Sequence, residues 1–105
     1  MIPVDDMDEL DEAIKSDKGV MMFLWRKECE DCPELGRKLA RLARKYPPLF
    51  AFSLLLDEHP TAAARFGVFN PPAVVVYAGH KMVMKQVERI DLQALARYLD
   101  KLYTH

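Results

Sequence analysis

The only two cysteines of the chain, Cys29 and Cys32, stand two residues apart in the stretch WRKECEDCPELGRK. Two thiols at this spacing suit a redox pair that makes and breaks a disulfide, half of a metal site, or two small side chains buried in a core. A purely structural disulfide is disfavoured, because so short a loop restrains the unfolded chain little. The chemistry at issue is therefore electron exchange, metal binding or none.

A metal site would need about two further ligands. The three histidines, His59, His80 and His105, are scattered along the chain, and no second paired motif follows. No metal site is predicted within one chain, and a metal bridging two copies stays open. Simple burial also fits poorly, since charged residues surround the cysteines. A redox pair is the favoured interpretation.

The elements on either side of the cysteines would position them. Val20–Trp25 is a continuous apolar run, VMMFLW, which is typical of a strand buried on both faces. Pro33 suits the first turn of a helix. One helical turn would bring the two sulfurs within bonding reach, and the helix dipole would stabilise a thiolate. We expect Cys29 to be the exposed, attacking residue and Cys32 the buried, resolving one.

The rest of the chain predicts an α/β arrangement of alternating elements. One helix follows an N-cap at Asp5 or Asp6, and another follows Asp91. Further strands and a short helix complete the order β-α-β-α-β-α-β-β-α, with strands expected at 2–4, 49–56, 73–77 and 81–87 and a helix within 57–67. Strands joined by helices are expected to be parallel neighbours, and the last two strands to form an antiparallel hairpin.

Composition limits the alternatives. The chain has 105 residues, half of them apolar, and a net charge of −1, which predicts a single domain over residues 1–105 and argues against a nucleic-acid partner. No run approaches the roughly 20 apolar residues of a membrane span. The acids of MIPVDDMDEL do not suit a secretory leader. We expect a soluble cytoplasmic protein.

This order of elements, with CxxC between the first long strand and its helix, resembles the thioredoxin family over nearly the whole chain. The resemblance rests on FLWRKECEDC and on DEHPTAAARFGVFNPPAVVVYAGHK, whose proline before a strand is Pro72. It implies the thioredoxin fold, a central mixed sheet of about four to five strands with helices on both faces. It also implies that Pro72 is the cis-proline that faces the catalytic pair, Cys29 and Cys32.

The resemblance further implies a protein-disulfide oxidoreductase. Its substrates would be protein or small-molecule disulfides, and thioredoxin reductase or a low-molecular-weight thiol would supply electrons without a bound cofactor. Beside the cysteines, the residues expected to contact substrate are Pro71, Pro72, Trp25, Glu28, Glu30 and Asp31. The alternatives are a binding or adaptor domain with slow, regulatory cysteines, and a glutaredoxin-like user of glutathione, which the CxxC sequence favours less.

Several positions depart from the family pattern. Glu28 stands where tryptophan is common, and Glu30-Asp31 replaces Gly-Pro. Three further departures lie outside the motif: Phe23 for a buried aspartate, Ser53 for its lysine partner, and Glu88 for a glycine. Carboxylates near Cys29 would raise the pKa of its thiol, while Arg26 and Lys27 would oppose this. We therefore hypothesise a reductant, with slower turnover because Cys32 lacks the buried acid.

Overall fold

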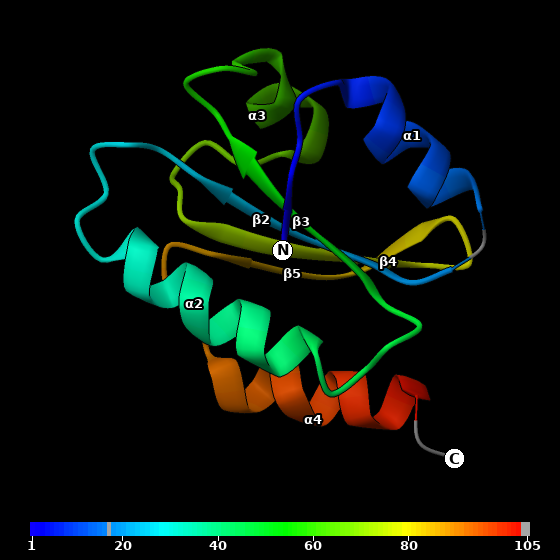
Figure 1. The fold of residues 1–105 in the computed structure, drawn as a ribbon. Coiled ribbons are helices and arrows are strands. Elements are labelled where there is room, and N and C mark those ends of the chain that lie inside the picture. Colours follow the sequence, from blue (N-terminus) through cyan, green and yellow to red (C-terminus); the bar gives the residue numbers. More distant parts are fainter. Residues whose placement is uncertain (17, 104–105) are drawn as a thin grey trace.

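The computed structural model describes residues 1–16 and 18–103 (Figure 1). The order of elements within these residues agrees with the order expected from the sequence. They are β1 (Ile2–Pro3), α1 (Met7–Lys15), β2 (Val20–Trp25), α2 (Cys32–Ala43), β3 (Phe50–Leu55), α3 (Thr61–Phe66), β4 (Ala73–Ala78), β5 (Lys81–Val87) and α4 (Leu92–Tyr103).

A five-stranded mixed sheet forms the centre of the molecule, in the order β1-β3-β2-β4-β5. β1, β3 and β2 are parallel, and β4 and β5 form a hairpin in which β4 runs antiparallel to β2. Helices α1 and α3 lie on one face of the sheet, and α2 and α4 lie on the other (Figure 1). The expectation of a mixed sheet with helices on both faces is confirmed.

The central strand β2 explains why its sequence is apolar without interruption. Successive side chains of a strand point to opposite faces. Met22 and Leu24 accordingly join the core under α1 and α3, while Met21 and Phe23 join the core under α2 and α4. All four side chains are at most 2% exposed. Each face thus receives half of the strand, and the two cores hold β2 rigidly where it approaches the cysteines.

The expectation that β4 is a parallel neighbour reached through a helix is wrong. β4 pairs antiparallel with β2 from Ala73, opposite Leu24. A parallel crossover must carry the chain back along the full length of the sheet, about 20 Å for a six-residue strand. Helix α3 has only six residues, or about 9 Å of length. The chain therefore stays at the edge where β2 ends and turns back there.

The same edge collects the connections that matter for chemistry. It receives the end of β2, the start of α2, the end of β3 and the start of β4 (Figure 1). The opposite edge carries the β4–β5 hairpin turn, in which Gly79 and His80 have φ values of 57° and 67°. Two successive positive φ values are those of a type I′ turn, which matches the twist of a hairpin. No helix in the described residues is long and apolar enough to span a membrane.

Candidate functional site

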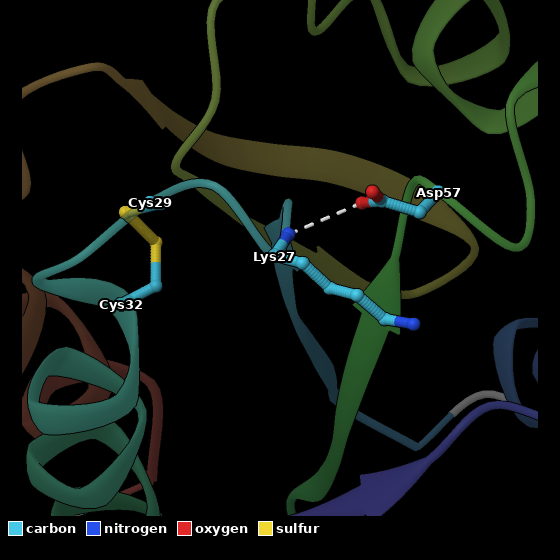
Figure 2. Close-up of a disulfide and its surroundings, with 4 residues drawn as sticks. All are labelled: Lys27, Cys29, Cys32 and Asp57. Carbon is cyan, nitrogen blue, oxygen red and sulfur yellow. Dashed lines mark hydrogen bonds between the residues drawn. A yellow bond between two sulfur atoms is a disulfide. The ribbon is translucent and has the colours of Figure 1, made fainter.

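Cys29 and Cys32 form a disulfide at the edge where β2 ends (Figure 2). Their Cα atoms are 5.4 Å apart. Cys32 is the first residue of α2 and is 1% exposed, whereas Cys29 lies in the preceding turn and is half-buried. The Cys32 N–H donates to the Cys29 carbonyl oxygen at 3.3 Å. The pair therefore has one accessible sulfur on a turn and one sealed sulfur on a helix.

The turn before α2 is fastened to the end of the neighbouring strand β3. The Leu56 N–H donates to the Trp25 carbonyl oxygen at 2.9 Å. The Lys27 N–H donates to the Asp57 carboxylate at 3.2 Å, as the dashed line in Figure 2 marks. Within the turn, the Cys29 N–H donates to the Arg26 carbonyl oxygen at 3.1 Å. These bonds connect Cys29 to the sheet and limit where its sulfur can point.

A groove of about 420 Å³ opens beside the disulfide. Its lining comes from three places in the chain: the start of α2, the loop before β4 and the segment from β5 to α4. The lining residues are Cys29, Asp31, Glu34, Leu35, Lys38, Pro72, Glu88, Ile90 and Leu92. The Glu88 N–H donates to the Pro72 carbonyl oxygen at 2.8 Å, which joins two of these segments. The accessible sulfur thus forms part of the wall of a ready-made depression.

Not all of the residues expected at the site lie in this groove. Cys29, Asp31 and Pro72 line it, and the Pro71–Pro72 peptide bond is cis. Cys32 lies beneath it in the core. The remaining four expected contacts are not among the lining residues: Trp25 and Pro71 are half-buried, and Glu28 and Glu30 are exposed.

Sequence reasoning missed most of the groove wall. Leu35 and Leu92 belong to the apolar stripes that are expected to face the core, yet both are only half-buried and reach the groove. Glu34 and Lys38 belong to no motif. Their helical spacing is the signal that could have found them, because residues three and four positions apart share a helix face. This places Glu34 beside Asp31 and Lys38 beside Glu34. Ile90 lies between β5 and α4 and gave no signal at all.

The carboxylates of the groove differ in whether a positive group is paired with them. Glu34 forms an ion pair of 2.7 Å with Arg37, and the hydrogen bond and positive charge of that guanidinium lower the pKa of Glu34. Asp31 occupies the N-cap position of α2 but makes no side-chain capping bond. In residues 1–16 and 18–103, the salt bridges involve neither Asp31 nor Glu88. Their carboxylates therefore line the groove without an ion pair in that part of the chain.

The space under the disulfide is apolar. Phe23 is 2% exposed, and its ring stacks in parallel with that of Trp25 at a centroid distance of 6.3 Å. The Trp25 indole N–H donates to the Ser53 hydroxyl at 3.4 Å. The described residues include no buried charged side chain. The core of the described residues therefore contains no carboxylate that could accept the proton of the Cys32 thiol.

The described residues contain no group of three or more side chains placed to hold a metal. His59 instead contacts the carbonyl oxygen of Val4 at 2.9 Å, and His80 contacts that of Ile14 at 3.1 Å. His105, the third histidine weighed as a ligand, lies outside the described residues.

Comparison with known sequences gives thioredoxins as relatives. A thioredoxin of Streptomyces clavuligerus is 30% identical over 93 residues, which cover 89% of this chain and 86% of that protein. A thioredoxin of Chlorobaculum thiosulfatiphilum is 29% identical over 91 residues, which cover 86% of this chain and 84% of that protein. No protein-family model matches the sequence.

Several solved structures with the same fold are thioredoxins. Oxidized thioredoxin O2 from Arabidopsis thaliana matches with a TM-score of 0.85 and 17% identity, over 98% of this chain and 94% of that one. A mutant thioredoxin from Halobacterium salinarum NRC-1 matches with a TM-score of 0.85 and 24% identity, over 99% of this chain and 90% of that one. These matches confirm the thioredoxin fold expected from the sequence.

Proposed function

The chain belongs to the thioredoxin family and is a thiol–disulfide oxidoreductase, and from this premise we propose that Cys29 and Cys32 are its catalytic pair. The observation that carries the proposal is their difference in exposure. Cys29 lines an open groove, whereas Cys32 is 1% exposed beneath it. A substrate disulfide can therefore reach the Cys29 sulfur but not the Cys32 sulfur. The Cys32 sulfur, in turn, can react only with Cys29.

The exposure of the two sulfurs sets the order of steps. The Cys29 thiolate attacks one substrate sulfur, the substrate disulfide breaks, and the departing sulfur takes up a proton. Cys32 then attacks Cys29 in the mixed disulfide. This second step forms the Cys29–Cys32 bond and releases the other substrate thiol. Two electrons and two protons pass from the protein to the substrate.

The substrate contacts and the direction of electron flow belong to the same proposal. The proposed substrate contacts are Pro72 and Asp31, which line the groove. Pro71, Trp25, Glu28 and Glu30 complete the proposed set, although they are not among the lining residues. We assign the protein as a reductant of protein or small-molecule disulfides, because carboxylates near Cys29 disfavour its thiolate and leave the reduced form without that stabilisation. Thioredoxin reductase or a low-molecular-weight thiol supplies the electrons, and the cytoplasm is the compartment that suits such chemistry.

Insulin disulfide reduction with dithiothreitol tests the proposal. We expect the wild-type protein to accelerate precipitation of the insulin chains, and Cys29→Ser to give the background rate of dithiothreitol alone. Cys32→Ser should retain the first step and accumulate a mixed disulfide with the substrate, visible by mass spectrometry without reductant. Equal rates for the wild type and Cys29→Ser would refute catalysis by this pair.

A second candidate function is a binding or adaptor domain whose cysteines react slowly. The apolar surroundings of Phe23 and the contact of Ser53 with Trp25 favour it, because neither supplies a base for Cys32. Single-turnover kinetics separate the two functions. The measurement compares two rates: release of the substrate by Cys32 in the wild type, and its release by dithiothreitol in the Cys32→Ser variant. In an oxidoreductase the first rate should be much higher than the second. In an adaptor the two rates should be similar.

A further inference from the structure

The groove beside Cys29 has an excess of negative charge, and this excess bears on which substrates it accepts. Three carboxylates line it, from Asp31, Glu34 and Glu88, against one ammonium group, from Lys38. The Glu34 carboxylate is bonded to the guanidinium of Arg37, so its charge is partly offset. Asp31 and Glu88 remain as the exposed carboxylates in the same wall as the accessible sulfur.

The apolar part of the wall makes these charges effective. The non-polar part of the lining comes from Leu35, Ile90, Leu92 and Pro72. A substrate segment would cover these side chains when it approaches Cys29. Water is displaced there, and charges that act through less water interact more strongly. A positive group beside the substrate disulfide would be attracted, and a negative group would be repelled.

We propose that Asp31 and Glu88 make this groove selective for cationic disulfides, meaning disulfides whose flanking groups are ammonium or guanidinium. The inference rests on the proposed function, since the groove is a substrate site only if Cys29 is the attacking residue. The disulfide in its wall marks the groove as a substrate site on grounds independent of charge. The carboxylates then decide which disulfides approach.

Three small disulfides of similar size separate charge from shape. Cystamine carries two ammonium groups, dithiodipropionate carries two carboxylates, and hydroxyethyl disulfide is neutral. The protein is first reduced and freed of reductant. It is then mixed with each disulfide, quenched with an alkylating agent and analysed by mass spectrometry for the loss of free thiols. In each reaction the substrate S–S bond breaks, the Cys29–Cys32 bond forms, and two substrate thiols carry away the two protons.

The rates need a reference, because the three disulfides differ in the acidity of their leaving thiols. Each rate is divided by the rate at which dithiothreitol, an uncharged dithiol, reduces the same disulfide. After this normalisation we expect cystamine to react about ten-fold faster than the neutral disulfide and dithiodipropionate about ten-fold slower, as attraction to or repulsion from two carboxylates at ~6 Å in water would give. Raising the salt concentration from about 0.02 M to about 0.5 M should compress the difference.

Substitution of the carboxylates assigns the effect. Glu88→Gln should reduce the preference for cystamine over the neutral disulfide about three-fold, the factor that one charge at ~6 Å in water predicts, and Asp31→Asn should act similarly. Glu88→Gly is a second way to remove the charge at this position, should glutamine disturb the loop. Glu12→Gln removes another exposed carboxylate, from α1 on the other face of the sheet, and should leave the preference unchanged.

The outcomes distinguish the inference from the function on which it rests. A protein that reduces insulin in a Cys29-dependent way but shows no preference for cystamine overturns the charge selection alone. So does a preference that survives both Glu88→Gln and Asp31→Asn. If the Cys29→Ser variant matches the wild type with insulin and with all three disulfides, the oxidoreductase function itself fails, and the selection fails with it.

Discussion

Cys29, the residue that we propose attacks the substrate, lies on the turn that precedes helix α2. Helix α2 begins at Cys32, so Cys29 lies three residues ahead of it. The stabilisation that a helix start offers a thiolate falls off within its first turn. Carboxylates of Asp31 and Glu88 line the same groove and act in the opposite direction. At the scale of single residues, we expect the carboxylates to outweigh the helix start at Cys29.

We therefore expect the pKa of the Cys29 thiol in the reduced protein to lie above its ordinary value of about 8.5. The Cys32→Ser variant isolates this thiol, and the ultraviolet absorbance of the thiolate against pH gives its pKa. Adding Asp31→Asn and Glu88→Gln should lower that pKa, while adding Glu12→Gln should not. A pKa below about 7 in the parent variant would contradict both this expectation and the assignment as a reductant.

At the scale of elements, α2 packs its glycine directly on the central strand. A Cβ at Gly36 would lie 3.4 Å from the Phe23 ring, an ordinary contact distance. Alanine in a helix interior is favoured over glycine by roughly 0.5–1 kcal/mol. Gly36→Ala should therefore raise the free energy of unfolding by about that amount, as measured by denaturant titration of the oxidised protein.

Gly19 provides the matched comparison for the same substitution. A Cβ there would collide with the Tyr103 hydroxyl, where the start of β2 meets the end of α4. Overpacking of this kind costs roughly 1–3 kcal/mol. Gly19→Ala should therefore lower the free energy of unfolding. If both substitutions moved stability in the same direction, the packing described for one of these two glycines would be wrong.

The sequence predicted the elements better than their arrangement, for a physical reason. Two local signals illustrate this: the uninterrupted apolar run VMMFLW and the N-cap at Asp6. The Asp6 side chain accepts a hydrogen bond from the Asp8 N–H at 2.9 Å, and tertiary contacts reinforce both signals. The direction of β4 depends on how far the short helix α3 can carry the chain, and the sequence pattern gives no measure of that distance.

The groove was harder to predict than the cysteines that it surrounds. The spacing of Cys29 and Cys32 is visible in the sequence. Glu88, Ile90 and Leu92, in contrast, reach the groove only because β5 ends and α4 begins at this edge. From the sequence, Glu88 is a departure from a family position and not part of a charged wall. Contacts between segments so far apart in the chain carry no local signal.

At the scale of the whole molecule, two tyrosines join the last helix to the end of α2. The rings of Tyr46 and Tyr103 are 5.9 Å apart, and the Tyr46 hydroxyl lies 3.4 Å from the Asp100 carboxylate. Burial raises the pKa of both hydroxyls, and the negative charge of Asp100 adds to the effect at Tyr46. Each tyrosine therefore holds its proton more tightly in the folded protein than in the unfolded chain.

Stability should fall at alkaline pH as a result. The unfolded chain loses tyrosine protons near its ordinary pKa of about 10, while the folded protein still holds them. The stabilisation is complete below that pH and is lost as the pH rises through the higher pKa of the folded state. Denaturant titrations at pH values below and above about 10 should show the loss. A Tyr46→Phe, Tyr103→Phe double variant should show a smaller one.

The backbone at Glu88 restricts the amino acids that this wall of the groove can carry. Its φ of 68° is in the left-handed region, which glycine adopts without cost, asparagine and aspartate tolerate, and β-branched side chains strongly resist. Valine, isoleucine and threonine are therefore poor replacements for Glu88. Single substitutions at this position can change the charge or size of the wall, but they cannot readily place a β-branched side chain there.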